Sequence, residues 1–143
     1  MLISWWHSLL DMEKHELEWH IKDVEDELSE LTEAKSIVEK VSERSDVVYT
    51  VTRAWWGGHK SLRFPLSKPE FLVGLIYMFP KYTLRWLFYY YIGKSFDRKI
   101  KITEVRNPKK IYKLKIIAKK YNLDENEFVK RVSIRLKRWI FLP

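Results

Sequence analysis

The chain has 143 residues and a mass of 17.5 kDa, a length that suits one domain of ordinary size. Hydrophobic residues make up 46% and aromatic residues 15%, which excludes a wholly disordered chain. Cysteine is absent, which excludes disulfides, cysteine-based zinc sites and thiol catalysis. Glutamine is absent too, and 32% of residues are charged, a composition that favours a hyperthermophile or one of its viruses or plasmids as the source.

The net charge of +8 is divided unevenly along the chain. Residues 1–45 hold 12 acidic against five basic residues, which gives −7, and residues 46–143 hold 22 basic against seven acidic, which gives +15. An acidic arm and a basic body predict an anionic partner, with nucleic acid first and an anionic membrane surface second. The alternative is that the two parts neutralise each other within the chain or across a dimer.

The first long element predicted is a single acidic helix from about residue 10 to residue 44. Its apolar seam has the alternating spacing of three and four that is typical of a helix packed along another helix. The seam consists of Leu17, Ile21, Val24, Leu28 and Leu31, with Leu10 and Val38 at its ends. The helix is interpreted as a dimerising coiled coil or, with slight preference, as the longest member of a bundle. Residues 1–6 do not resemble a signal peptide, so we expect a cytoplasmic protein.

Residues 47–64 favour a β-hairpin, because residues 47–52 are β-branched and aromatic and Gly57–Gly58 suits a two-residue turn. An ordered aromatic loop is the competing interpretation. A helix start follows at Ser67, with Pro69 in the first turn and Glu70 three residues after the cap.

Residues 71–92 are nearly all apolar, and 22 residues are enough to cross a bilayer. Pro80 interrupts the run, and Lys81 and Arg85 lie near its middle, where each costs on the order of 3 kcal/mol in a membrane. We therefore expect a Pro-kinked or broken helix pair in the core, ending at Gly93. An interfacial membrane helix is the alternative.

The last third predicts a short strand over residues 99–105 and then two helices. Asn122 suits a left-handed helix end, and Asp124 with Glu127 suits the next N-cap. The apolar faces of the two helices are Ile111, Leu114, Ile117, Ala118 and Tyr121, and then Phe128, Val132, Leu136 and Ile140.

Catalytic signals are weak. His15 and His20 are five residues apart, so on one helix they diverge by about 140° and do not hold one metal ion. His7 and His59 are isolated in the sequence, and no serine, histidine and aspartate have the spacing of a triad. We expect a protein that is not an enzyme and has no cofactor and no metal.

The segment of about residues 98–139, with its order of strand, proline, helix, turn and helix, resembles the ribbon-helix-helix family of dimeric DNA-binding proteins. The resemblance implies that Lys99, Lys101 and Thr103 read bases, that Ile100 and Ile102 face the core, and that the backbone near Asn126 holds a phosphate. The same segment is similar to a helix-turn-helix at Ile117–Ala118, Asn122, Leu123 and Phe128. A third interpretation is that two basic amphipathic helices simply complete a bundle.

The sequence thus predicts a mainly α fold: a long N-terminal helix and a bundle of about four helices, with the hairpin and the strand. Three segments, 1–45, 46–95 and 96–143, form one compact domain. We expect a small DNA-binding regulator with duplex DNA as partner, contacting it through Lys99, Lys101, Thr103, Lys109, Lys110, Lys130, Arg131, Arg135 and Arg138. The seam residues would contact a second copy or another partner. The alternative is a protein-interaction function, as a virion component or an inhibitor of a host machine such as a polymerase, and peripheral membrane association is a third.

Overall fold

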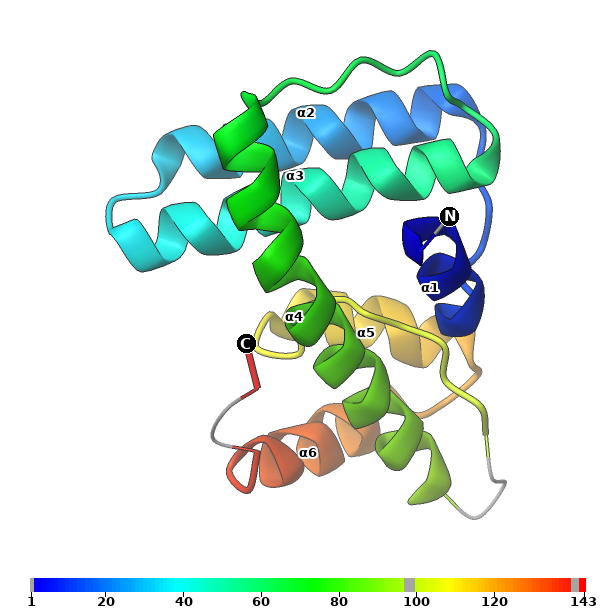
Figure 1. The fold of residues 1–143 in the computed structure, drawn as a ribbon. Coiled ribbons are helices and arrows are strands. Elements are labelled where there is room, and N and C mark those ends of the chain that lie inside the picture. Colours follow the sequence, from blue (N-terminus) through cyan, green and yellow to red (C-terminus); the bar gives the residue numbers. More distant parts are fainter. Residues whose placement is uncertain (1, 97–99, 140–141) are drawn as a thin grey trace. The chain divides into compact units, whose positions relative to one another are not determined.

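The computed structural model describes residues 2–96, 100–139 and 142–143, and these residues form helices and connecting segments (Figure 1). The helices are α1 (Leu2–Leu10), α2 (Leu17–Glu33), α3 (Ile37–Gly57), α4 (Lys68–Lys94), α5 (Ile111–Lys120) and α6 (Glu125–Leu136). No β-strand occurs in this part of the chain. The predicted mainly α class and the helical bundle are therefore confirmed, whereas both predicted β elements are wrong.

The chain forms two compact units, residues 1–80 and residues 81–143, which we call the N-terminal and the C-terminal unit. The N-terminal unit contains α1, α2, α3 and the first part of α4. The rest of α4, together with α5 and α6, belongs to the C-terminal unit. The boundary falls inside the predicted segment 46–95.

The single helix predicted over residues 10–44 is wrong, because the chain breaks at residues 11–16 and again at residues 34–36. Asp11 has a φ of 53°, in the left-handed region. Ser36 begins α3 with a capping box: its side chain accepts from the backbone N–H of Glu39, and the Glu39 carboxylate accepts from that of Ser36. These two local stops outweigh the helical periodicity, because each satisfies backbone groups that a continuous helix would use.

The predicted seam lies on α2, which packs beside α3 in the same chain (Figure 1). Val24 is buried and Leu28 and Leu31 are half-buried, whereas Leu17 and Ile21 remain 36% and 38% exposed. The seam therefore contributes to a helical hairpin within the N-terminal unit. Its predicted contact with a second chain stays a prediction.

Residues 47–57 of the segment predicted to form a hairpin belong to the second half of α3, where residues 45–54 are all buried. The hydroxyl groups of Thr50 and Thr52 donate to backbone carbonyls one turn earlier, at Val47 and Val48. Gly58 has a φ of 113° and ends the helix, with its N–H donating to Ala54 and Trp55 carbonyls. Burial on every side explains the pattern, because a fully buried helix has no polar face and tolerates β-branched residues that pack well.

Helix α4 begins directly after Ser67, and the Glu70 carboxylate accepts from both the backbone N–H and the hydroxyl of Ser67. It continues through Pro80, so the predicted broken pair is wrong. It crosses α3 closely at Gly74, where a Cβ atom would lie 2.7 Å from Val48 Cγ2 and 2.9 Å from the Arg44 carbonyl oxygen. None of the helices in the described residues has the length and apolar character needed to span a membrane.

The core of the C-terminal unit gathers around the second part of α4. Its buried members are Phe88, Tyr89, Ile92, Phe96, Ile102, Leu114, Ile117, Ala118, Phe128, Val132 and Leu142. Residues 100–105 cross this core without forming a strand, and Lys99 lies outside the described residues. The backbone N–H of Thr103 instead donates to the Tyr121 hydroxyl at 3.1 Å, because no neighbouring strand is present in the described residues to accept it.

The turn between α5 and α6 follows its prediction. Asn122 has a φ of 53°, and the Asp124 carboxylate accepts a 2.7 Å hydrogen bond from the backbone N–H of Glu127. These two residues end α5 and start α6 within four positions, so the helices fold back on each other as a pair.

Candidate nucleic-acid interface

The two compact units carry net charges of opposite sign. The N-terminal unit has nine Lys and Arg against 14 Asp and Glu, for a net charge of −5. The C-terminal unit has 18 against five, for a net charge of +13. The positive charge is thus a property of one folded unit, which can attract a polyanion as a whole.

One face of α6 presents a row of polar and basic side chains. Phe128 and Val132 are fully buried and fix the opposite side of the helix in the core. The exposed residues, spaced three or four apart so that they share a face, are Asn126, Lys130, Ser133 and Lys137. We call these four residues the α6 row. Amide, hydroxyl and ammonium groups of this kind donate hydrogen bonds to phosphate oxygens and to base edges.

Helix α5 adds exposed cations beside α6. Lys115 and Lys119 are exposed on the side of α5 that faces away from the buried Leu114 and Ile117. Lys119 Nζ lies 3.6 Å from a carboxylate oxygen of Glu125, and its side chain is still 73% exposed. An ion pair this exposed contributes little to stability, so the ammonium group stays accessible to another anion.

The predicted nucleic-acid contacts divide into accessible and internal residues. Lys101, Lys109, Lys130 and Arg138 are exposed, and Lys110 and Arg135 are half-buried. Lys99 lies outside the described residues.

Arg131 and Thr103 are half-buried and bond to other residues of the C-terminal unit. The Arg131 guanidinium donates to the Ser95 carbonyl and to the Glu127 carboxylate, and it lies 4.4 Å from the centroid of the Phe96 ring. Thr103 bonds to Tyr121 through both its N–H and its hydroxyl. The sequence shows that Arg131 is basic, but its contacts with Ser95, Glu127 and Phe96 are visible only in the structure.

The resemblance to the ribbon-helix-helix family is overturned, because that family pairs strands and residues 100–105 form none. Ile102 does face the core, at 1% exposure, but as part of an extended segment. The phosphate contact implied near Asn126 fails too. The Asp124 carboxylate already occupies that end of α6, with Glu125 and Glu127 beside it.

Part of the positive charge is balanced inside the C-terminal unit. Glu104 is buried, and its carboxylate lies 2.9 Å from Lys120 Nζ and 3.6 Å from Arg106 Nε. The Lys120 contact anchors the extended segment to α5, and the Arg106 contact lies within the segment's own end. The α6 row and Lys115 remain exposed.

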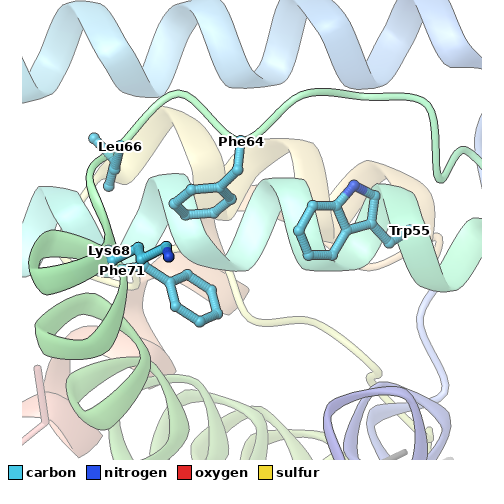
Figure 2. Close-up of a pocket in the computed structure, with 5 residues that line it drawn as sticks. All are labelled: Trp55, Phe64, Leu66, Lys68 and Phe71. Atoms are coloured by element: carbon cyan, nitrogen blue, oxygen red, sulfur yellow. The ribbon is translucent and has the colours of Figure 1, made fainter.

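The N-terminal unit has an open apolar pocket of about 260 Å³, shown in Figure 2. It is lined by Trp55, Phe64, Leu66, Lys68 and Phe71. The Phe64 and Phe71 rings meet edge to face at 4.8 Å. The volume is below the roughly 300 Å³ at which small-molecule sites begin, so the pocket suits a single side chain better than a metabolite.

All four histidines lie in the N-terminal unit, and three of them form a cluster. The centroid of the His20 ring lies 5.4 Å from that of His59 and 6.1 Å from that of His15. His15 lies before the first residue of α2, so it does not share a helix with His20 and the angle expected on one helix does not separate the two rings. The prediction that His59 is isolated is therefore wrong.

His7 stands apart from this cluster, fully buried, with Nε2 3.0 Å from the Thr52 hydroxyl oxygen. Burial, and then the Arg53 guanidinium, lowers the pKa of His7 from its ordinary 6.5 to about 3. Burial is also the largest cause that lowers the pKa of His20 to about 4, followed by Arg53, His59 and His15. Both rings are neutral at pH 7.

Comparison of the chain with protein-family models, with curated proteins and with solved structures gave no match.

Proposed function

We propose that the protein binds nucleic acid, with duplex DNA as the expected form, through the exposed basic surface of α5 and α6. The observation that carries this proposal is the charge of +13 on a single compact unit of the chain. The α6 row supports it, because it places two lysines, an asparagine and a serine on one exposed helix face.

The mechanism would be chiefly electrostatic. Each phosphate that a lysine or arginine neutralises releases condensed counterions. A plot of the logarithm of the affinity against the logarithm of the salt concentration therefore has a negative slope of about 0.9 per neutralised phosphate. Lys130, Lys137 and Lys115 would neutralise phosphates. Ser133, between the two lysines of the row, and Asn126, at its start, would contact sugars or base edges.

The test is fluorescence anisotropy of a labelled duplex, titrated with the full chain from low to near-physiological salt. The double variant Lys130→Glu, Lys137→Glu lowers affinity at least tenfold and reduces the salt slope by about two. The matched control is Lys22→Glu, Lys40→Glu, which makes the same charge change at exposed positions of the N-terminal unit.

The control variant binds like the natural chain if the surface of α5 and α6 is the interface. Equal losses of affinity in the two variants would show that net charge alone, and not this surface, determines binding. Absence of binding at low salt would refute the proposal.

A protein-interaction function is the second candidate, favoured by one face of α1. Leu2, Trp5 and Leu9 are 66%, 59% and 53% exposed at helical spacing, while Trp6 and Leu10 are buried. Exposed apolar stripes of this kind mark contact surfaces for other proteins. Two measurements test this function: light scattering after size-exclusion chromatography, and affinity capture of partners with Trp5→Glu as the control. A chain that is monomeric and captures no partner would exclude it.

A further inference from the structure

The imidazole of His20 is buried without a hydrogen-bond partner. Its side chain is 1% exposed, and neither Nδ1 nor Nε2 has a partner. An unsatisfied buried polar atom costs about 1–3 kcal/mol, so two on one ring indicate that something else meets them. The other buried histidine, His7, bonds to Thr52 through Nε2.

The surroundings of His20 bring further imidazoles to it. A Cβ atom at Gly57 would lie 3.5 Å from His20 Nε2 and 3.7 Å from His59 Cδ2, so the two rings meet beside a residue that has no side chain. The His15 ring is stacked on Trp19 at 3.9 Å, and Trp19 in turn lies edge-on to His20 at 5.1 Å. Three imidazoles from three places in the sequence thus converge.

We propose that His15, His20 and His59 bind one divalent transition-metal ion, with Zn²⁺ as the representative ligand. Neutral imidazole nitrogen is a preferred donor for Zn²⁺, Cu²⁺ and Ni²⁺, and three protein ligands with a water in the fourth position make a common zinc site. The lowered pKa of His20 keeps its ring neutral, with a lone pair to offer at pH 7.

The ring spacing is close to what one ion requires. With Zn–N bonds of about 2.0–2.1 Å and tetrahedral angles, two imidazoles on one zinc ion have centroids about 5 Å apart. The His20 and His59 rings, at 5.4 Å, nearly meet this spacing, and the His15 ring lies 6.1 Å from that of His20.

The movement that binding needs falls outside the helices. In the described residues, the donor atoms that gather in threes within 4.8 Å are the carboxylates of Glu27, Glu30 and Glu43, not the imidazoles. His15 and His59 lie on the segments before α2 and after α3, where their rings can turn toward His20. His59 Nε2 now lies 3.0 Å from the His15 carbonyl oxygen, a contact that turning would exchange for the metal.

Arg53 is the group that opposes a cation here, because its positive charge acts on His20. Its guanidinium donates a 2.8 Å hydrogen bond to the Glu13 carbonyl, and it lies 4.9 Å from the centroid of the Trp19 ring. The N-terminal unit as a whole has a net charge of −5, which favours a cation.

The test is long-range ¹H–¹⁵N NMR of the four histidine rings in the full chain, titrated with Zn²⁺ after removal of metals with a chelator. The signals of His15, His20 and His59 shift together and saturate at one equivalent, while those of His7 stay in place and serve as the internal control. Shifts in none of the three rings, or equal shifts in all four, would overturn the proposal.

Calorimetric titration with Zn²⁺ gives a second measurement. The variant His15→Gln, His59→Gln weakens binding by more than the roughly 10–100-fold that loss of an outer-shell partner costs. The control Glu27→Gln, Glu30→Gln disrupts the carboxylate group and leaves the affinity unchanged. The reverse result, with affinity lost only in the carboxylate variant, would place the ion elsewhere and refute the histidine site.

Discussion

The carbonyl oxygen of Ile100 lies against the α-carbon of Gly93, inside the contact distance of any Cβ atom that residue 93 would carry. This approach lets the extended segment pass directly over the end of α4. A methyl group there meets backbone, which cannot move aside as a flexible side chain would. We expect Gly93→Ala to lower the free energy of unfolding by about 1–3 kcal/mol, measured by urea denaturation.

The control is Gly57→Ala, since a Cβ atom at Gly57 makes only ordinary contacts, at 3.5 and 3.7 Å. That variant should be neutral or slightly stabilising, because alanine favours a helix over glycine by up to about 1 kcal/mol. Equal destabilisation by both substitutions would mean that the Ile100 contact is not the cause.

The capping box at the start of α3 makes a second prediction. Ser36→Ala removes the acceptor for the backbone N–H of Glu39 and should cost about 1 kcal/mol of stability. Ser29→Ala, at an exposed position inside α2, is the matched control and should be neutral or stabilising. Chemical denaturation of both variants measures the difference, and a neutral Ser36→Ala would contradict the role of the cap.

Two neighbouring cations on α6 should behave differently. Arg131→Gln removes contacts to Ser95, Glu127 and the Phe96 ring, so we expect a loss of about 1–3 kcal/mol in stability. Lys130→Gln, at an exposed position, should leave stability within about 0.5 kcal/mol of the natural chain. Thermal or urea unfolding separates the two, and equal effects would contradict the assignment of Arg131 to the interior.

The buried histidines predict a loss of stability in mild acid. The unfolded chain binds protons at His7 and His20 near pH 6.5, whereas the folded chain binds them only near pH 3 and pH 4. Stability is therefore complete above about pH 6.5 and falls as the pH drops toward 4, by up to about 1.4 kcal/mol per pH unit for each histidine. Urea unfolding at a series of pH values, with a chelator present, measures this slope.

The variant His7→Gln identifies the cause. It removes one of the two titrating rings and keeps a group that can bond to Thr52, so the slope between pH 6.5 and pH 5 should fall by about half. Hydrogen bonds from Ser36 and Ser67 hold the pKa values of Glu39 and Glu70 below their ordinary 4.5, so these carboxylates act below this window. An unchanged slope in the variant would assign the acid sensitivity to other groups.

Local signals in the sequence predict these helix ends correctly, but they predict β elements that do not form in the described residues. Ser67, Asn122 and Asp124 behave as predicted, because capping depends on residues within four positions of each other. Residues 47–52 have the β-branched composition of a strand, yet they form a helix that is buried on every side. Burial of that kind depends on the surrounding helices, which a local pattern does not contain.

The candidate sites show the same division. The excess of basic residues in the C-terminal unit is visible in the sequence. The difference between the exposed Lys130 and Arg131, which bonds to Ser95, depends on the tertiary structure. The approach of His59 to His20 is also tertiary, because 38 positions separate them along the chain. The capping box at Ser36 and Glu39 is a local sequence pattern, so the sequence alone is sufficient to predict the break between α2 and α3.

Pro80, the last residue of the N-terminal unit, lies in the interior of α4, so both units share one helix. A truncation at that boundary would cut the helix and leave its main-chain groups unpaired on both sides of the cut. Dissection into an acidic and a basic fragment would therefore damage the folding of each. Assigning an activity to either unit calls for point substitutions in the intact polypeptide, where both retain their share of α4.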